Sequence, residues 1–325
     1  MAKRRKSFSA SAKTTSEELP PIRGKESFSV SAGTTPERLL SEAFSASSET
    51  ASEEPPFWGS YGPFDQHSGG AWRERELRVS QSGSRELALG EEPIQKDRVV
   101  VAEEVELSLQ CRVRSGHSFL AQRLCVELHR GARLKFVLRL EEGGAILSAL
   151  RFVLAEGAFL EILLSQQGVR RSRLELDLQL RGEGSSATAL LTGFGRGEQR
   201  LDCRVRQVHR ASRTESRLRV KTALEDRACA VFGGQVVMEE SAANSTASQK
   251  AEQLMLSPEA LAHSLPDLDI RTDAASCSHG ATVAPLDETA LFYLGTRGID
   301  CAVARQVLRE AFLGLAFDFK EIGPA

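Results

Sequence analysis

Apolar and polar residues alternate along much of the chain between residues 76 and 240. Five apolar residues from Val105 to Val113 occupy every second position, and polar residues lie between them. A strand with one buried and one solvated face has this period of two. The pattern therefore predicts an all-β core. The same alternation recurs in segments 124–128, 134–140, 174–180 and 201–205.

Short turns separate several of these segments, at residues 131–132, 157–158 and 226–228. A tight turn followed by a small residue and a strand fits the corner of a β-solenoid, whose interior is narrow. Alternation of this kind fits an antiparallel sandwich equally well. The pattern alone leaves both folds open.

The apolar period changes after residue 256. Residues 257–259 (Ser-Pro-Glu) have the composition of a helix start, because serine caps helices and proline suits the first helical position. Asp287 is predicted to cap a short helix that ends at Gly295, and Asp300 a second helix that reaches about Phe317.

Four apolar residues share one face of the second predicted helix: Val303, Val307, Ala311 and Leu315. An open stack of strands needs its last turn covered. We therefore expect the two helices to cover the end of the core and to offer a surface to a partner.

By composition the chain divides into four parts. Seventeen of the first 56 residues are Ser or Thr and few are large and apolar, which predicts a disordered low-complexity tail over residues 1–56. Residues 57–75 are interpreted as a linker and residues 76–256 as the β core. Residues 257–325 are interpreted as the end of the core together with a helical region that docks a partner.

Charge and composition exclude several classes of protein. The 42 basic and 44 acidic side chains nearly cancel, so no overall field favours nucleic acid or an anionic membrane. The longest apolar run, residues 145–155, is shorter than the ~20 residues of a spanning helix. Six cysteines without a Cys-x-x-Cys pair indicate reduced thiols and a cytoplasmic protein. The basic, serine-rich start leaves a plastid transit peptide as the alternative.

Cys277 and His279 are the main candidates for chemistry. Residues two apart in a strand point to the same side, where a thiol and an imidazole could bind one metal ion or form a thiolate–imidazole pair. The alternative is a buried thiol beside a hydrogen-bonded imidazole. No Cys or His nearby completes a zinc spacing, so further ligands would come from a partner chain or a sulfide.

An enzyme is the second hypothesis. β-Solenoid polysaccharide hydrolases and lyases use clustered carboxylates or basic residues, and here Asp202 with His209, or Cys277 with His279, could form an acid–base pair. The sequence has no Gly-x-x-x-x-Gly-Lys-[Ser/Thr] loop. Any ATP hydrolysis would therefore be the work of another chain.

Several motifs in order resemble the C-terminal signature of the SufB/SufD family, the scaffold subunits of SUF iron–sulfur cluster assembly. The resemblance covers roughly residues 85–318. In SufB-type subunits a sulfur-accepting cysteine follows the glutamine that corresponds to Gln249, whereas Lys250 follows it here, so the chain is more similar to the SufD type. The motifs are residues 266–270 (PDLDI), 277–282 (CSHGAT), 286–288 (LDE), 291–294 (LFYL) and 297–299 (RGI).

This resemblance implies a fold and a function. The fold is a right-handed parallel β-helix with short C-terminal helices and a disordered N-terminal tail. The function is that of a non-catalytic scaffold subunit, which pairs with a SufB-like chain and docks a SufC-like ABC ATPase. Neither nucleic acid nor a membrane is an expected partner.

It also implies roles for individual residues. His279, and with it Cys277, would act in cluster assembly at the interface with the SufB-like partner, where a transient iron–sulfur cluster or iron is held. A flavin in the complex is compatible with the family, and no cofactor is expected to bind stably to this chain alone. The candidates for docking the ATPase are Phe292, Tyr293, Arg297 and Phe312.

Overall fold

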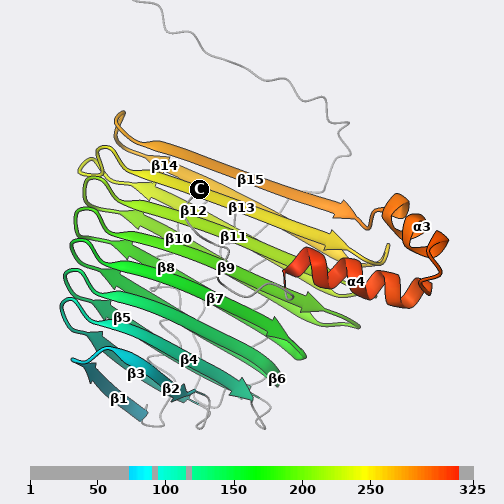
Figure 1. The fold of residues 1–325 in the computed structure, drawn as a ribbon, viewed down its shortest axis with the longest axis horizontal. Coiled ribbons are helices and arrows are strands. Elements are labelled where there is room, and N and C mark those ends of the chain that lie inside the picture. The colour runs from blue at the N-terminus through cyan, green and yellow to red at the C-terminus, as the bar shows by residue number, and fades with distance from the viewer. Residues whose placement is uncertain (1–72, 90–93, 115–118, 315–325) are drawn as a thin grey trace, which may run out of the picture.

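The computed structural model describes residues 73–89, 94–114 and 119–314, which form a parallel β-solenoid of about seven turns with two C-terminal helices (Figure 1). The predicted tail, residues 1–56, lies outside the described residues. So does the predicted linker, residues 57–75, apart from its last three residues, which belong to the first strand.

Two parallel sheets face each other across the solenoid interior, and every strand pair is parallel. This confirms the β-helix and excludes the antiparallel sandwich. Sheet A contains β1 (Arg73–Val79), β3 (Ile94–Val101), β5 (Phe119–Leu128), the second half of β6 (Arg133–Leu154), β8 (Val169–Leu180), β10 (Arg200–His209), β12 (Cys229–Met238) and β14 (Leu261–Ile270). Sheet B contains β2 (Gly83–Ala88), β4 (Glu106–Arg114), the first half of β6, β7 (Phe159–Gln167), β9 (Ser186–Gly195), β11 (Glu215–Leu224), β13 (Thr246–Met255) and β15 (Ser276–Pro285).

Strand register stacks the alternating apolar residues into columns. Leu107, Leu134 and Leu160 are direct neighbours on successive turns of sheet B, and all three are buried. Phe136 of sheet B meets Phe152 of sheet A edge to face, with ring centroids 5.1 Å apart. The alternation in the sequence therefore marks the interior, where each buried Leu or Phe contributes about 1.5–3 kcal/mol.

Corners join the strands and form hydrogen-bonded stacks of their own. Gly131 N donates to Glu156 O over 2.9 Å, and Gly157 N donates to Glu183 O over the same distance. Several corners place a residue in the left-handed region, with φ of 64° at both glycines and 57° at Asp226. The turns predicted at residues 131–132, 157–158 and 226–228 are thus confirmed as corners.

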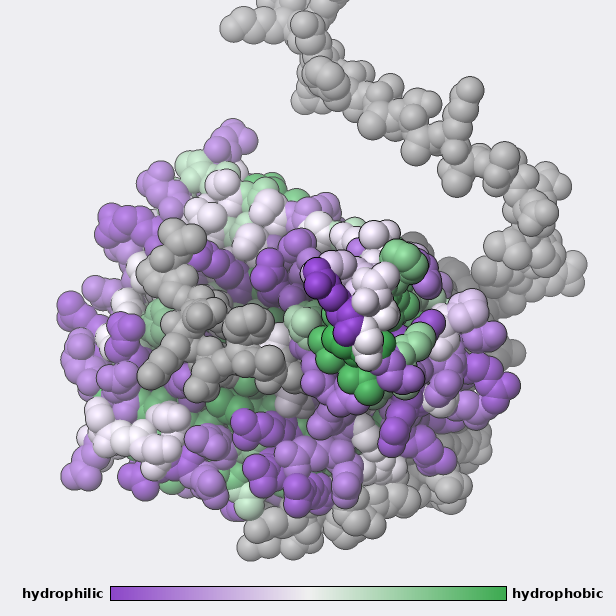
Figure 2. All heavy atoms as spheres, turned by 45° about the vertical axis from the view of Figure 1, so that its right-hand side comes forward, coloured by the Kyte–Doolittle hydropathy of each residue, from purple (hydrophilic) through white to green (hydrophobic). Residues whose placement is uncertain are grey.

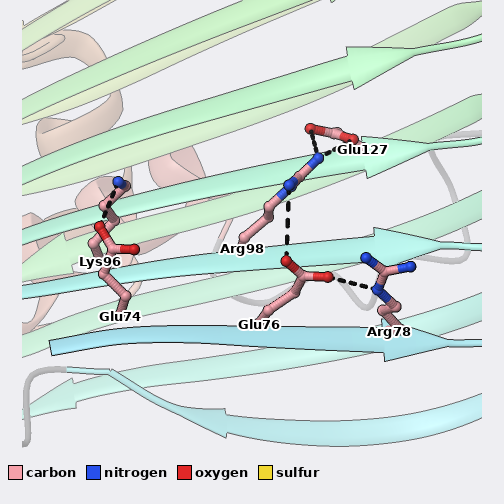
Figure 3. Close-up of polar contacts among 6 residues, drawn as sticks. All are labelled: Glu74, Glu76, Arg78, Lys96, Arg98 and Glu127. Atoms are coloured by element: carbon pink, nitrogen blue, oxygen red, sulfur yellow. Dashed lines mark hydrogen bonds and ion pairs between the residues drawn. The ribbon is translucent and has the colours of Figure 1, made fainter.

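Charged side chains line the outer face of sheet A near its N-terminal end. Lys96 Nζ lies 2.7 Å from Glu74 Oε1, and Arg98 Nη2 lies 2.9 Å from Glu127 Oε1; each pair joins neighbouring strands (Figure 3). Such exposed pairs contribute little stability. Their consequence is a charged first edge, and charge on an edge strand discourages pairing with another sheet.

The helix predicted to start at residues 257–259 does not form. These residues make a corner between β13 and β14, where Ser257 Oγ accepts a hydrogen bond of 2.8 Å from Asp226 N. Serine and proline favour turns as well as helix starts, so the composition was ambiguous. The β structure continues through β14 and β15 to Pro285.

The two C-terminal helices begin where the sequence predicted. In α3 (Glu288–Thr296) the carboxylate of Asp287 accepts from Thr289 N, and in α4 (Cys301–Leu313) that of Asp300 accepts from Ala302 N. Helix α4 ends at Leu313, and Gly314 caps it in the left-handed conformation. Neither helix is long and apolar enough to cross a membrane.

Contrary to expectation, the helices do not cover the last turn of the solenoid. Helix α4 lies against the outer face of sheet B, where the guanidinium of Arg309 stacks 4.2 Å from the Phe194 ring and Lys221 Nζ donates to Phe312 O over 2.6 Å (Figure 1). Val303 and Val307 are exposed, whereas Ala304 and Leu313 are buried.

Candidate functional site

The C-terminal end of the solenoid is open. Among the described residues β14 pairs only with β12 and β15 only with β13, so each leaves one backbone edge unpaired. Figure 1 places these two strands at the end of the stack opposite β1. The last turn therefore exposes both its interior side chains and its edge.

Cys277 and His279 lie on the inner face of this last turn. On β15 they pair in register with Ala247 and Gln249 of β13, both of which are buried in the interior. Cys277 packs with the apolar cluster that contains Met238 and Ala247, and His279 is exposed at the open end. The prediction that the thiol and the imidazole face the same way is confirmed.

The surroundings of Cys277 hold it in the thiol form. Burial raises the pKa of the Cys277 thiol, and a backbone hydrogen bond from Ala247 opposes that shift. A metal ion or a partner cation would be needed to ionise it near neutral pH. Among the described residues no three His, Cys, Asp or Glu side chains gather at one place, so these two are at most part of a ligand set.

Gln249 lies directly beneath His279 and was missed as a site residue by sequence reasoning. It is only 2% exposed, and among the residues that the structure describes neither polar atom of its carboxamide has a hydrogen-bond partner. On the same strand Gln253 differs, because its Nε2 donates to Ser264 Oγ over 2.6 Å and to His263 O over 2.9 Å. An alternating strand does not reveal which residue stacks under which, so only the register identifies Gln249.

Four exposed apolar side chains lie at the rim of the open end. Leu261, Leu265 and Ile270 of β14 and Val283 of β15 are all exposed, with Leu265 at 53%. Exposed apolar side chains beside an unpaired strand edge favour contact with another sheet. This end contrasts with the charged first edge at β1.

The acid–base pair proposed from Asp202 and His209 is not formed. Asp202 lies on the outer face of β10, 2.9 Å from Arg204 Nε. His209 lies on the inner face, fully buried, with its ring nitrogens 2.7 Å from the hydroxyls of Thr214 and Ser216. Burial lowers the pKa of His209 to about 4. The two side chains are on opposite sides of one strand and cannot act together.

The docking candidates fall into two groups. Phe292 and Tyr293 on α3 are exposed, Phe292 at 75%, and the guanidinium of Arg297 lies 5.3 Å from the Tyr293 ring. Phe312 on α4 is instead partly buried against the sheet, in a cluster with Leu313. Figure 2 shows apolar residues gathered on the side where the helices lie, and Val303 and Val307 add to the exposed apolar surface.

Comparison with known proteins identifies the family of this chain. The family model of the SUF system FeS cluster assembly SufBD core domain matches residues 90–312. The SufD proteins of Escherichia coli and Bacillus subtilis are 31% and 30% identical to this chain over 134 residues, which is 41% of this chain and 32% and 31% of theirs. A chloroplast protein of Arabidopsis thaliana, ABCI7, is 41% identical over 83 residues, 26% of this chain and 18% of that protein.

These alignments span about a third or less of the relatives' own lengths. The family model, by contrast, covers most of the chain and all but the first strands of the solenoid. The chain belongs to the SufB/SufD family of the SUF iron–sulfur cluster assembly system.

Proposed function

We propose that this chain is a SufD-like, non-catalytic scaffold subunit of iron–sulfur cluster assembly. The observation that carries the proposal is the open last turn, which exposes His279 beside Cys277 at an apolar rim. Two of the relatives are named as iron–sulfur cluster assembly proteins of the SufD type. Within the described part of the chain no third His, Cys, Asp or Glu joins these two, so the surface is suited to sharing a metal site with a neighbour.

The partner at this end is a SufB-like chain. Its own solenoid edge would add strands to β14 and β15, extending both sheets, because no described strand pairs with the outer edges of these two. Pairing would bury the apolar rim and enclose His279 between the two subunits. The charged strand β1 makes the opposite edge unsuited to the same contact.

The cargo at the interface is iron or a transient iron–sulfur cluster. The neutral imidazole of a histidine is a ligand that iron accepts, and a thiolate is a stronger one. Cys277 would become a thiolate only on binding metal, since burial raises the pKa of its thiol. The remaining ligands would come from the SufB-like partner or from sulfide.

A SufC-like ATPase docks on the exposed surface of the two helices, formed by Phe292, Tyr293, Arg297, Val303 and Val307. Helix α4 contacts the strands of sheet B directly, through Arg309 on Phe194 and Lys221 on Phe312. A motion imposed on α4 by nucleotide-driven closure of the ATPase would therefore reach the paired solenoids. The assembly would work in the cytoplasm.

Anaerobic reconstitution of the co-expressed complex tests this function. The chain with its SufB-like partner, supplied with iron and sulfide, should develop the visible absorbance of an iron–sulfur cluster. His279→Ala should lose most of that absorbance and keep the complex intact. His263→Ala, which removes an exposed histidine from β14 of the same turn, should retain it. An unchanged spectrum in His279→Ala would contradict the role of this residue.

A further inference from the structure

One interior column of sheet B changes from apolar to polar in its last two turns. Successive turns stack Leu109, Phe136, Ile162, Ala189 and Leu218, and all of these are buried. Gln249 and then His279 follow in the same column. A carboxamide thus replaces a hydrocarbon side chain in the interior, directly beneath the exposed imidazole.

Burial of this carboxamide lowers the stability of the folded chain. A buried amide without a hydrogen bond has lost its hydrogen bonds to water and has gained none within the protein. Among the described residues Gln249 is the only glutamine whose side-chain oxygen and nitrogen are both buried and unpartnered. Gln166, which also faces the interior, accepts a hydrogen bond of 2.8 Å from Ser172 Oγ.

The opposite sheet provides room for this unpartnered group. Gly234 of β12 faces the interior, and a Cβ built on it would lie 2.6 Å from Cδ of Gln249. The carboxamide therefore occupies the space that a side chain at position 234 would need. Gly234 has no side chain, and the unpartnered carboxamide of Gln249 fills that space, one turn below the open end.

We propose that Gln249 is a metal ligand at the open end, and that its carboxamide oxygen binds a divalent transition-metal ion together with His279. The two residues are register neighbours on adjacent parallel strands, whose backbones run about 4.8 Å apart. Ligands at about 2.0–2.3 Å from one ion can come from such neighbours. Iron(II) accepts imidazole nitrogen, thiolate sulfur and amide oxygen, so Cys277 on the same face supplies a third ligand.

This inference deepens the proposed function, because the iron of the assembly reaction would be the natural occupant. Binding of a metal ion by the chain itself can nevertheless be tested without any partner. It requires only that the open end holds an imidazole, a thiol and a carboxamide on one face, which the strand register places there.

Titration of the full chain with Co²⁺ under anaerobic conditions tests the site. Cobalt(II) is a spectroscopic probe for iron(II), with visible bands that report nitrogen, oxygen and sulfur ligands. The unmodified chain should develop these bands on saturation. Gln249→Leu should weaken Co²⁺ binding about 10–100-fold, as should His279→Ala, whereas Gln249→Glu should bind as tightly or more tightly because a carboxylate is a stronger ligand.

Gln166→Leu is the matched control, since it removes an interior carboxamide that is already hydrogen-bonded three turns away. It should leave Co²⁺ binding unchanged and lower the melting temperature. Gln249→Leu should instead raise the melting temperature of the metal-free chain, by roughly 2–4 °C, because no hydrogen bond is lost. If Gln166→Leu lowers the melting temperature and Gln249→Leu raises it, Gln249 contributes to metal binding and not to stability.

The outcomes separate this inference from the proposed function. No Co²⁺ bands in the unmodified chain, or equal affinity in the unmodified chain and Gln249→Leu, would overturn the inference and leave Gln249 with an ordered water. Cluster formation in the complex could still depend on His279 in that case. Gln249-dependent Co²⁺ binding by a chain that recruits no SufB-like partner would support the inference and contradict the proposed function.

Discussion

Buried polar side chains in the second half of the solenoid interior are of two kinds, and the difference lies in their partners. His209 belongs to a satisfied network: Thr214 Oγ1 and Ser216 Oγ each lie 2.7 Å from a ring nitrogen, and Thr214 Oγ1 donates to Ser245 Oγ over 2.8 Å. Gln249 has no such network. The first arrangement fixes a corner of the fold, and the second is available to a ligand.

His209 makes stability dependent on pH. Burial lowers its pKa from 6.5 to about 4 in the folded protein, so the unfolded chain binds a proton more readily. The contribution of His209 to the free energy of unfolding should therefore change little above pH 7 and fall by about 3 kcal/mol as the pH drops from 7 to 4. Urea unfolding across this range would measure the decrease. His209→Gln should lack this component, and an identical pH profile in both proteins would contradict the prediction.

Gly234 should be intolerant of a side chain because of Gln249. Gly234→Ala places a Cβ on the carboxamide and should destabilise the protein by about 1–3 kcal/mol. The loss should be smaller in the background of Gln249→Ala, which a double-mutant cycle of chemical unfolding would show. Gly280→Ala is the control, since no atom lies within 4 Å of a Cβ there. Equal losses in both backgrounds would indicate that the two residues do not share this space.

Sequence reasoning could place Cys277 and His279 on one face, because a strand's period of two fixes that relation locally. Sequence reasoning could not predict that His279 lies beside Gln249, or that Gln249 contacts Gly234. Those contacts depend on the number of residues in each turn, which varies from 22 between Leu77 and Val99 to 32 between Cys229 and Leu261. A local pattern carries no information about this varying register.

At the scale of elements, Ser, Pro and Asp occur both at corners of the solenoid and at helix starts. Residues 257–259 were predicted to start a helix and form a corner instead, whereas Asp287 and Asp300 do cap helices. The difference comes from the following residues. Leu261, His263 and Leu265 alternate outward along β14, and a neighbouring strand, β12, is available for pairing. Tertiary pairing therefore decides between two structures that the local sequence allows.

Helix α4 carries two groups of apolar side chains, and only one of them packs on the solenoid. The stripe containing Val303 and Val307 has the regular helical spacing, yet it is exposed. Leu308, Phe312 and Leu313 instead pack on the solenoid. A helix that buries its less regular face has a second apolar face free for a partner.

The two docking phenylalanines should behave differently when replaced by a charged residue. Phe292→Asp changes a side chain that is 75% exposed, so it should abolish capture of a SufC-like ATPase and leave the melting temperature within about 2 °C. Phe312→Asp disturbs the cluster with Leu313 and the cation–π contact with Lys221, so it should also destabilise α4. Circular dichroism and pulldown on both variants would separate the effects. Retained capture by Phe292→Asp would count against α3 as the docking surface.

At the scale of the whole molecule, the two ends of the solenoid differ in character. The first edge is formed by β1, whose sequence RERELRV carries charges at five positions. The last edge, formed by β14 and β15, is flanked by the exposed Leu261, Leu265, Ile270 and Val283. A solenoid with one charged and one apolar end can form a closed pair and is prevented from stacking into fibres.

This asymmetry predicts that the two partners bind independent surfaces. Leu265→Lys places a charge on the apolar rim, where the side chain is 53% exposed, and should weaken pairing with a SufB-like chain at least tenfold, about 1.4 kcal/mol. It should leave capture of the ATPase unchanged. Val307→Lys makes the same kind of change on α4, where the side chain is 44% exposed. It should weaken capture of the ATPase and leave pairing with the SufB-like chain unchanged.

Binding of each partner to both variants would be measured with purified chains, because co-expression can hide a weakened contact. Both variants should keep the melting temperature of the unmodified chain, since neither side chain is part of the buried core. If Leu265→Lys paired normally, β14 would not be at the interface. If either variant lost both partners, the two surfaces would be coupled, and the open end and the helices could not be treated as separate binding sites.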